Sequence, residues 1–315
     1  MSNQNQQEKF KTMIGGQALI EGIVMRGPEK ESIVVRGPEG LVVKTQPLKL
    51  VAKKHKIYGW PFIRGIVNFG GSMVNGIKAL LYSAEFFPEE EVGEPSKFDQ
   101  WLEKKIGSEK MEKYVIYSAL VLGLAMAVGL FVLLPTFIAG LFKGLHGNYF
   151  ARNLVEGIVK IVLFMGYMIL VSQMKDMKRV FSYHGAEHKT IRCYEAQLPL
   201  TVENVRPMTR KHPRCGTSFL LVVICISILL GAVIRVDNTF ARMGLHLLLL
   251  LPIVAISYEF NRLVGRHDNW LTRILTAPGQ WMQNFTTHEP DDSMIEVAIT
   301  ALQEVLPEQE GTDQW

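Results

Sequence analysis

The chain has 315 residues, 48% of them hydrophobic, and its 34 Lys and Arg against 30 Asp and Glu give a net charge of +4. This small positive charge does not indicate a nucleic-acid partner, and three cysteines do not form a disulfide framework. The first ten residues are polar, so we expect no secretory signal.

The N-terminal part of the chain has three runs rich in β-branched residues, at 23–26, 33–36 and 41–45. Gly-Pro and Glu-Gly pairs separate them, which predicts a small antiparallel meander. Gly15 and Gly16 precede these runs, and we interpret them as turn glycines rather than as an anion cradle. Glu21 lies among apolar residues and needs a partner, either a metal ion or a basic side chain.

Residues 63–87 have a helical period of apolar side chains, including Ile66, Met73 and Leu80. This predicts an amphipathic helix that lies on a membrane surface or packs on the meander, and the sequence leaves both open. Gly93 and Pro95 interrupt an acidic stretch, where we expect a domain boundary.

Four later segments are apolar enough to be membrane spans. They are Tyr114–Phe142, Leu154–Val171, Phe219–Val233 and Met243–Phe260. Lys and Arg are concentrated before the first span, between the second and third, and after the fourth. By the positive-inside rule, both termini and the loop 173–217 lie in the cytoplasm. We therefore predict a multi-pass protein of the inner (cytoplasmic) membrane.

The sequence His184-Gly185-Ala186-Glu187-His188 has the order H-x-x-E-H, which is an inverted zinc-protease motif. We expect the second span to continue as a helix into this motif. His184 and His188 then share one helix face and can offer two imidazole nitrogens to one metal ion. Glu187 can serve as general base toward a water molecule. Histidine pairs at this spacing also occur on ordinary solvated helix faces, so that alternative stays open.

A second pair, His212 and Cys215, has the three-residue spacing of zinc ligands and precedes the third span. Together with His184 and His188 it gives a tetrahedral set, which is typical of a structural zinc site. If His212 or Cys215 does not bind the metal, the site is open and suits catalysis. The alternative for His212 is a cation that meets lipid headgroups.

Three further titratable residues, Glu259, Glu289 and His246, have other possible roles. Glu259 and Glu289 are possible additional metal ligands, although the acidic group around Glu289 also suits the start of a final helix, 294–305. His246 lies inside the fourth span, where an interhelical hydrogen bond is expected.

Several longer stretches resemble the YqhQ-like family of bacterial membrane proteins, which are described as predicted metal-dependent enzymes. They are Ile14–Gly22, Met25–Pro28, Tyr183–Lys189, His212–Ser218 and Glu289–Asp292. The resemblance covers roughly residues 12–305. It implies membrane residence and a metal site at positions 184, 188, 212 and 215, but no reaction. His288 replaces the Arg expected before Glu-Pro-Asp, which argues against His288 as a ligand.

These observations predict an α-helical polytopic membrane protein with four spans, an N-terminal β-meander and cytoplasmic amphipathic helices. The expected parts are 12–88 (meander and helix), 89–113 (linker), 114–262 (membrane domain with the loop 173–217) and 263–315 (C-terminal tail). The predicted function is a metal-dependent hydrolase, with a divalent metal that is zinc by its ligands and with an amphiphilic or membrane-bound substrate. The alternatives are a scaffold that binds a membrane partner around a structural metal and, less favoured, a transporter.

Overall fold

The computed structural model describes residues 10–48, 56–87, 108–267, 269–309 and 311–314. The chain forms two compact units. The first unit comprises residues 1–87, 167–226 and 251–315, and the second comprises 88–166 and 227–250. The linker predicted at 89–113 lies largely outside the described residues.

The first unit begins with a four-stranded antiparallel sheet whose strands are in chain order. The strands are β1 (Gly15–Leu19), β2 (Gly22–Arg26), β3 (Lys30–Gly37) and β4 (Gly40–Pro47). The register pairs Gln17 with Val24 and Val24 with Ile33. The predicted meander is therefore confirmed, with β1 as an additional strand. Gly15 and Gly16 lie inside β1, so their interpretation as turn glycines is wrong.

Helices make up most of the described chain. In the first unit they are η2 (Lys56–Gly59), α1 (Ile63–Ala84), α6 (Lys175–Glu195), α7 (Val202–Val205), α11 (Trp270–Thr286) and α12 (Asp292–Gln303). The second unit contains α3 (Ser108–Val128), η3 (Gly129–Leu133), α4 (Leu134–Leu141), η4 (Lys143–Leu145) and α9 (Thr239–Leu248). The boundaries between the units fall inside α5 (Tyr149–Gln173), α8 (Gly216–Gly231) and α10 (Leu250–Arg266).

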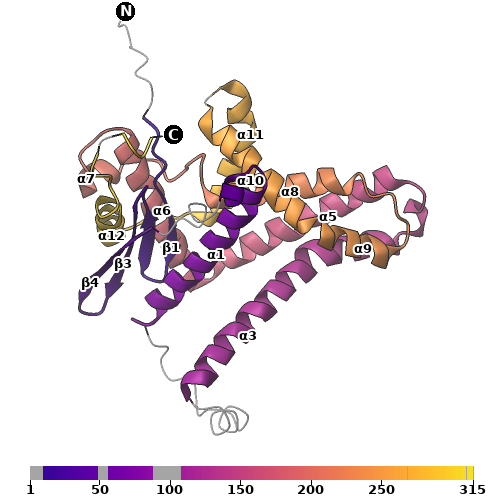
Figure 1. Cartoon of the computed structure of the whole chain (residues 1–315), viewed down its shortest axis with the longest axis horizontal. Helices are drawn as coiled ribbons and strands as arrows, with labels where there is room; N and C mark the ends of the chain where they lie inside the picture. Colours follow the sequence, from indigo (N-terminus) through magenta and orange to yellow (C-terminus); the bar gives the residue numbers. More distant parts are fainter. Residues whose placement is uncertain (1–9, 49–55, 88–107, 268, 310, 315) are drawn as a thin grey trace, which may run out of the picture. The chain divides into compact units, whose positions relative to one another are not determined.

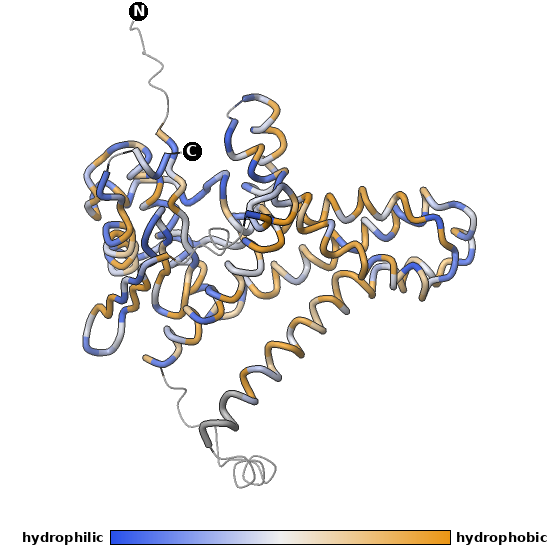
Figure 2. Tube along the Cα trace, in the orientation of Figure 1, coloured by the Kyte–Doolittle hydropathy of each residue, from blue (hydrophilic) through white to orange (hydrophobic). Residues whose placement is uncertain are grey.

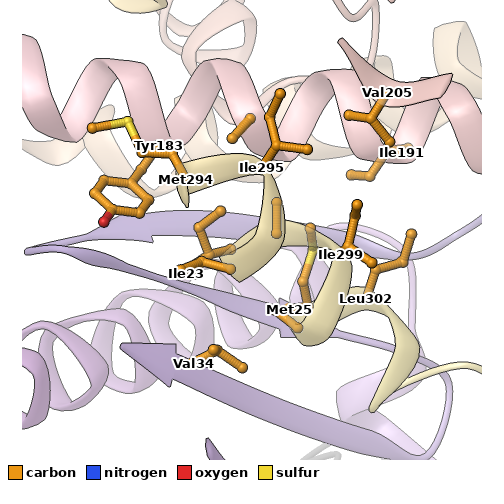
Figure 3. Packing of buried hydrophobic residues seen from close by; sticks show 14 of the residues in the cluster. Ile23, Met25, Val34, Tyr183, Ile191, Val205, Met294, Ile295, Ile299 and Leu302 are labelled. Carbon is orange, nitrogen blue, oxygen red and sulfur yellow. The ribbon is translucent and has the colours of Figure 1, made fainter. Parts of the chain in front are cut away.

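The core of the first unit lies between one face of the sheet and the helices α6 and α12. Figure 1 shows α12 beside α6 and the sheet, and Figure 3 shows the packing, with Ile23 and Met25 of β2 meeting Ile295 and Ile299 of α12. Because side chains alternate along a strand, Val24 points to the opposite face. The N-terminal sheet and the C-terminal helix are thus parts of one hydrophobic core.

Helix α1 packs against that opposite face of the sheet through its small residues. Ala79 is buried with Leu19, Val24, Ile33 and Val35 of the strands. The large apolar residues of α1 remain exposed, among them Ile66, Met73, Val74, Leu80 and Leu81. The structure therefore shows the packing on the meander, and the exposed apolar residues of α1 leave its place at a membrane surface a prediction.

Membrane-spanning length occurs in fewer helices than the sequence predicts. Among the described residues, Tyr114–Leu141 and Tyr149–Gln173 are long and apolar enough to cross a bilayer, and Figure 2 shows the apolar colouring along them. A third span is possible if Thr239–Leu248 and Leu250–Arg266, which are sharply bent at a break, count as one.

The prediction of four spans is therefore not confirmed. The apolar run at Phe219–Val233 belongs to α8, which has 16 residues. At 1.5 Å per residue such a helix is roughly 24 Å long, shorter than the roughly 30 Å hydrocarbon layer. The run at Met243–Phe260 is interrupted at Leu249, which ends α9.

In the second unit, a buried carboxylate joins α5 to α9. Arg242 donates from Nε to Glu156 at 2.6 Å, and Nε2 of His246 lies 3.1 Å from the same carboxylate. Arg152, one helical turn before Glu156, is fully buried beside it. The expected interhelical hydrogen bond of His246 is confirmed, and its partner, Glu156, was not predicted.

Candidate metal centre

The H-x-x-E-H motif lies in the second half of α6, where the helix is enclosed by the rest of the first unit. A continuous helix from the second span into the motif was expected, but Met174 adopts an extended conformation and separates α5 from α6. From Gly185 to Ile191 every residue of α6 is buried. The motif is therefore part of a folded core, and the alternative of two solvated surface histidines is wrong.

Three of the predicted ligands meet at one point. One donor atom each from His184, His188 and Cys215 lies within 4.8 Å of the other two. The rings of His184 and His188 are 4.4 Å apart between centroids, as expected for residues one helical turn apart. Nε2 of His184 is 3.2 Å from Sγ of Cys215. This arrangement could hold a metal ion.

Both histidines of the cluster are oriented by backbone carbonyls behind them. Nδ1 of His184 lies 2.8 Å from the carbonyl oxygen of Thr286, and Nδ1 of His188 lies 2.5 Å from that of Arg210. A carbonyl only accepts, so each Nδ1 carries a proton, which leaves Nε2 as the ring nitrogen that can face the cluster. Metal-binding histidines are typically fixed in this way.

The sulfur of Cys215 is held just before the N-terminus of α8. The backbone N–H of Thr217 points at Sγ from 3.4 Å, and the Thr217 hydroxyl is 3.1 Å away. Burial alone would raise the pKa of the thiol, but the adjacent imidazoles of His184 and His188 lower this pKa well below its usual value. Correspondingly, and against the effect of burial, Cys215 raises the pKa of His184 to about 9. The sulfur is therefore favoured as a thiolate, the form that binds metals.

Glu187 lies beside the cluster. One of its carboxylate oxygens accepts a hydrogen bond, and the other has no partner among the described residues. The backbone N–H of Gly16 donates to Oε1 at 2.9 Å. Oε2 is buried and has no hydrogen-bond partner among the described residues. Burial raises the pKa of this carboxyl. A buried oxygen without a partner is unfavourable unless a ligand or water satisfies it, so Oε2 marks a binding position.

His212 is close to the cluster, but both nitrogens of its ring contact groups outside it. Its ring lies 5.7 Å from that of His188 between centroids. Nε2 faces Glu195 at 3.4 Å, and Nδ1 accepts from the backbone N–H of Arg214 at 3.4 Å. The three-donor cluster contains no atom of His212. The structure thus brings together three of the four predicted ligands, which corresponds to the open alternative rather than to the closed set.

A cavity of about 260 Å³ gives access to this place. Its walls include His184, Glu187, His188 and Cys215, together with the segment 12–16 of the N-terminal part. The three clustered donors and the carboxylate therefore line one cavity, in which a small molecule or water can reach all of them.

Two glycines and one glutamine are needed for this geometry, although their roles were not predicted. A Cβ on Gly185 would lie 2.1 Å from the carbonyl oxygen of His288, and one on Gly16 would lie 2.6 Å from that of Val24. The fully buried side chain of Gln283 accepts from the N–H of His212 at 2.8 Å and donates to its carbonyl at 2.7 Å. H-x-x-E-H motifs give no signal for such contacts, because their partners are distant in sequence.

The other acidic candidates have basic partners instead of a place in the cluster. Glu21 accepts from Arg179 through both oxygens, with 2.6 Å for one of them, so the structure shows the salt-bridge alternative. Glu259 pairs with Arg64, and Glu289 with Lys189 at 2.6 Å. None of the three carboxylates belongs to the donor cluster.

Comparisons with known proteins agree on one family. A family model described as "Protein of unknown function (DUF1385)" matches residues 60–308, which include the cluster. The chain is also 33% identical over 301 residues to a protein of Bacillus subtilis (strain 168) described as "Uncharacterized protein YqhQ". That alignment covers 95% of this chain and 93% of the relative. No solved structure matches the chain.

Proposed function

This chain belongs to the DUF1385 family, as its resemblance to YqhQ-like proteins predicted, and we propose that it is a metal-dependent hydrolase. The observation that carries the proposal is the buried, unpaired Oε2 of Glu187 in the cavity that the three donors line. Three protein ligands leave a fourth position for water or substrate, as in catalytic zinc sites. Two imidazoles and a thiolate favour zinc among the divalent ions.

In the proposed mechanism, His184 and His188 would hold the ion through an imidazole nitrogen each, and Cys215 would hold it through Sγ. Such an ion supplies Lewis-acid activation of a water molecule. Oε2 of Glu187 would act as the general base toward water, and the Gly16 N–H donates to Oε1 and so fixes the carboxylate. Glu195 and Arg214 keep His212 away from the fourth position.

We further propose that the site lies at the cytoplasmic surface of the membrane. Residues 15–47 and 292–303 pack in one core, so both must lie on the same side of any bilayer that the chain crosses. This requirement supports an even number of complete crossings. The apolar helix α3–α4 and the helix α5 then form one pair of membrane crossings. The helices α8 and α9–α10 either form a second pair of crossings or enter and leave the membrane on the same side. The basic residues assign this side to the cytoplasm.

The first test is the metal itself. Full-length protein purified in detergent should contain about one zinc or other divalent ion per chain. His184→Ala and Cys215→Ser should each lose it, because each removes one of three protein ligands. A His184→Ala protein with undiminished metal content would eliminate this centre.

The second test separates an enzyme from a scaffold with a structural metal. Glu187→Gln should keep its metal but fail to complement a deletion strain, because loss of a general base typically costs about 10²–10⁴ in rate. Glu289→Gln is the matched control, since this carboxylate is exposed and outside the cluster. Metal content must be measured on the same preparations. Full metal and full complementation in Glu187→Gln would favour the scaffold.

A further inference from the structure

A second and larger cavity, of about 630 Å³, adjoins the candidate metal centre in the first unit. Its walls come from α6, the segment 208–214, the end of α10 and the first half of α11. Arg214 lines both cavities, so the two share a wall one residue away from the ligand Cys215. The volume is in the range of small-molecule sites.

The walls of this cavity, hereafter the basic cavity, carry an excess of positive charge. Among the described residues that line it, Lys11, Arg192, Arg214 and Arg273 are basic, whereas Glu195 carries a carboxylate. That carboxylate already accepts hydrogen bonds from Arg214 and from the backbone N–H of Thr12.

Two of these cations retain hydrogen-bonding capacity. Arg192 donates through Nε and Nη2 to the carbonyl oxygen of Lys211, a neutral acceptor, at 3.3 and 3.1 Å. Nη1 of Arg214 is buried and has no partner among the described residues. A buried guanidinium nitrogen without an acceptor is costly, so both the charge and the missing acceptor indicate an anionic ligand.

The helix that closes the basic cavity has an apolar side suited to a bilayer surface. Thr272, Arg273 and Thr276 of α11 line the cavity. On the same helix Trp270 is 73% and Ile274 60% exposed. An amphipathic helix with exposed aromatic and aliphatic residues beside basic ones is typical of the membrane interface. A ligand with an acidic headgroup and an apolar tail meets both surfaces.

We propose that the basic cavity binds the phosphate group of the substrate, which makes the substrate class a phosphorylated amphiphile. Planar guanidinium groups match the oxygens of a phosphate better than other cations do. Arg214 links this group to the metal centre, so the adjacent part of the same molecule reaches the cluster. This inference rests on the proposed hydrolase function for its meaning, but binding of the phosphate group does not require the metal.

The test measures thermal stabilisation of the full chain after removal of metal with a chelator. One arm adds inorganic phosphate, and the other adds phosphatidylglycerol to micelles of a detergent that carries no phosphate group. A shift of the melting temperature with phosphate identifies the free ion as sufficient, and a shift only with phosphatidylglycerol identifies a lipid headgroup. Absence of a shift in both arms overturns the inference, while an undiminished metal content in untreated protein leaves the metal centre intact.

Substitution of one cation locates the binding. Arg273→Gln, on the exposed surface of α11, and Lys11→Gln should each weaken the apparent affinity about tenfold, because each removes a charge-assisted contact. Arg266→Gln is the control, since Arg266 is exposed nearby at the end of α10 but does not line the cavity. Equal weakening in all three proteins would indicate general charge attraction and contradict the proposal. Wild-type protein that is purified without any metal but still binds phosphate would refute only the hydrolase.

Discussion

A methyl group added at Gly185 tests whether the close approach of Gly185 to the backbone of His288 holds the candidate metal centre in place. In Gly185→Ala the new Cβ would lie 2.1 Å from the carbonyl oxygen of His288, whereas ordinary contacts begin at 3.4 Å. One of the two backbones must therefore move by more than an ångström. The segment that carries His288 also supplies the carbonyl of Thr286 to Nδ1 of His184. Displacement of this segment removes the hydrogen bond that orients the ligand.

Two effects of opposite sign set the expected magnitude. Overpacking costs about 1–3 kcal/mol and here approaches the upper value because both atoms belong to backbone-fixed groups. Replacement of glycine by alanine inside a helix returns about 1 kcal/mol. The net loss of about 2 kcal/mol should lower the melting temperature by several degrees. Loss of the orienting hydrogen bond should weaken metal affinity about 10- to 100-fold.

The assay compares Gly185→Ala with Gly71→Ala, in which the new Cβ has no neighbour within 4 Å on helix α1 of the same unit. The control should be as stable as the wild type or slightly more stable, and its metal content should be unchanged. Melting temperature and metal per chain are measured on the same preparations. If Gly185→Ala keeps both values of the wild type, the close contact does not position the ligand.

Three other changes give further expected outcomes. Gln283→Leu should lower the melting temperature and the metal content, since it leaves the buried N–H and carbonyl of His212 without partners at about 1–3 kcal/mol each; wild-type behaviour would contradict this. Glu21→Gln should retain all the metal and cost about 1 kcal/mol, because Glu21 forms a partly exposed salt bridge with Arg179 and has no place in the donor cluster. Metal loss would restore Glu21 as a ligand. A reporter fused after Trp315 should be cytoplasmic, and an extracytoplasmic signal would reverse the proposed topology.

The sequence predicted those features that depend on neighbours along the chain. The meander follows from alternating runs and turn pairs, and the pairing of His184 with His188 follows from the period of a helix. Cys215 was also correctly grouped with them. Hydropathy located the apolar helices, but it could not show that α8 ends after 16 residues or that the last apolar run is broken.

The remaining features depend on contacts between distant segments. The spacing of His212 and Cys215 fits a zinc site. However, Gln283 accepts from the backbone N–H of His212, and the imidazole of His212 faces Glu195 instead of the cluster. The glycines of β1 were assigned to turns because a single sequence does not reveal what approaches them. The apolar face of α1 was correctly identified. That the helix packs on the sheet through its small residue Ala79 depends on the shape of the sheet.

The shared core of the sheet and α12 has a consequence for the order in which the protein is made. The strands emerge first from the ribosome, and roughly 250 residues follow before α12 is available to cover β2 and β3. At about 5–20 residues per second this interval lasts on the order of 10–50 seconds. The segment that supplies the Thr286 carbonyl behind His184 is also synthesised late. The candidate metal centre is therefore completed only when synthesis is nearly finished, and a ribosome that stalls early leaves a chain without a completed site.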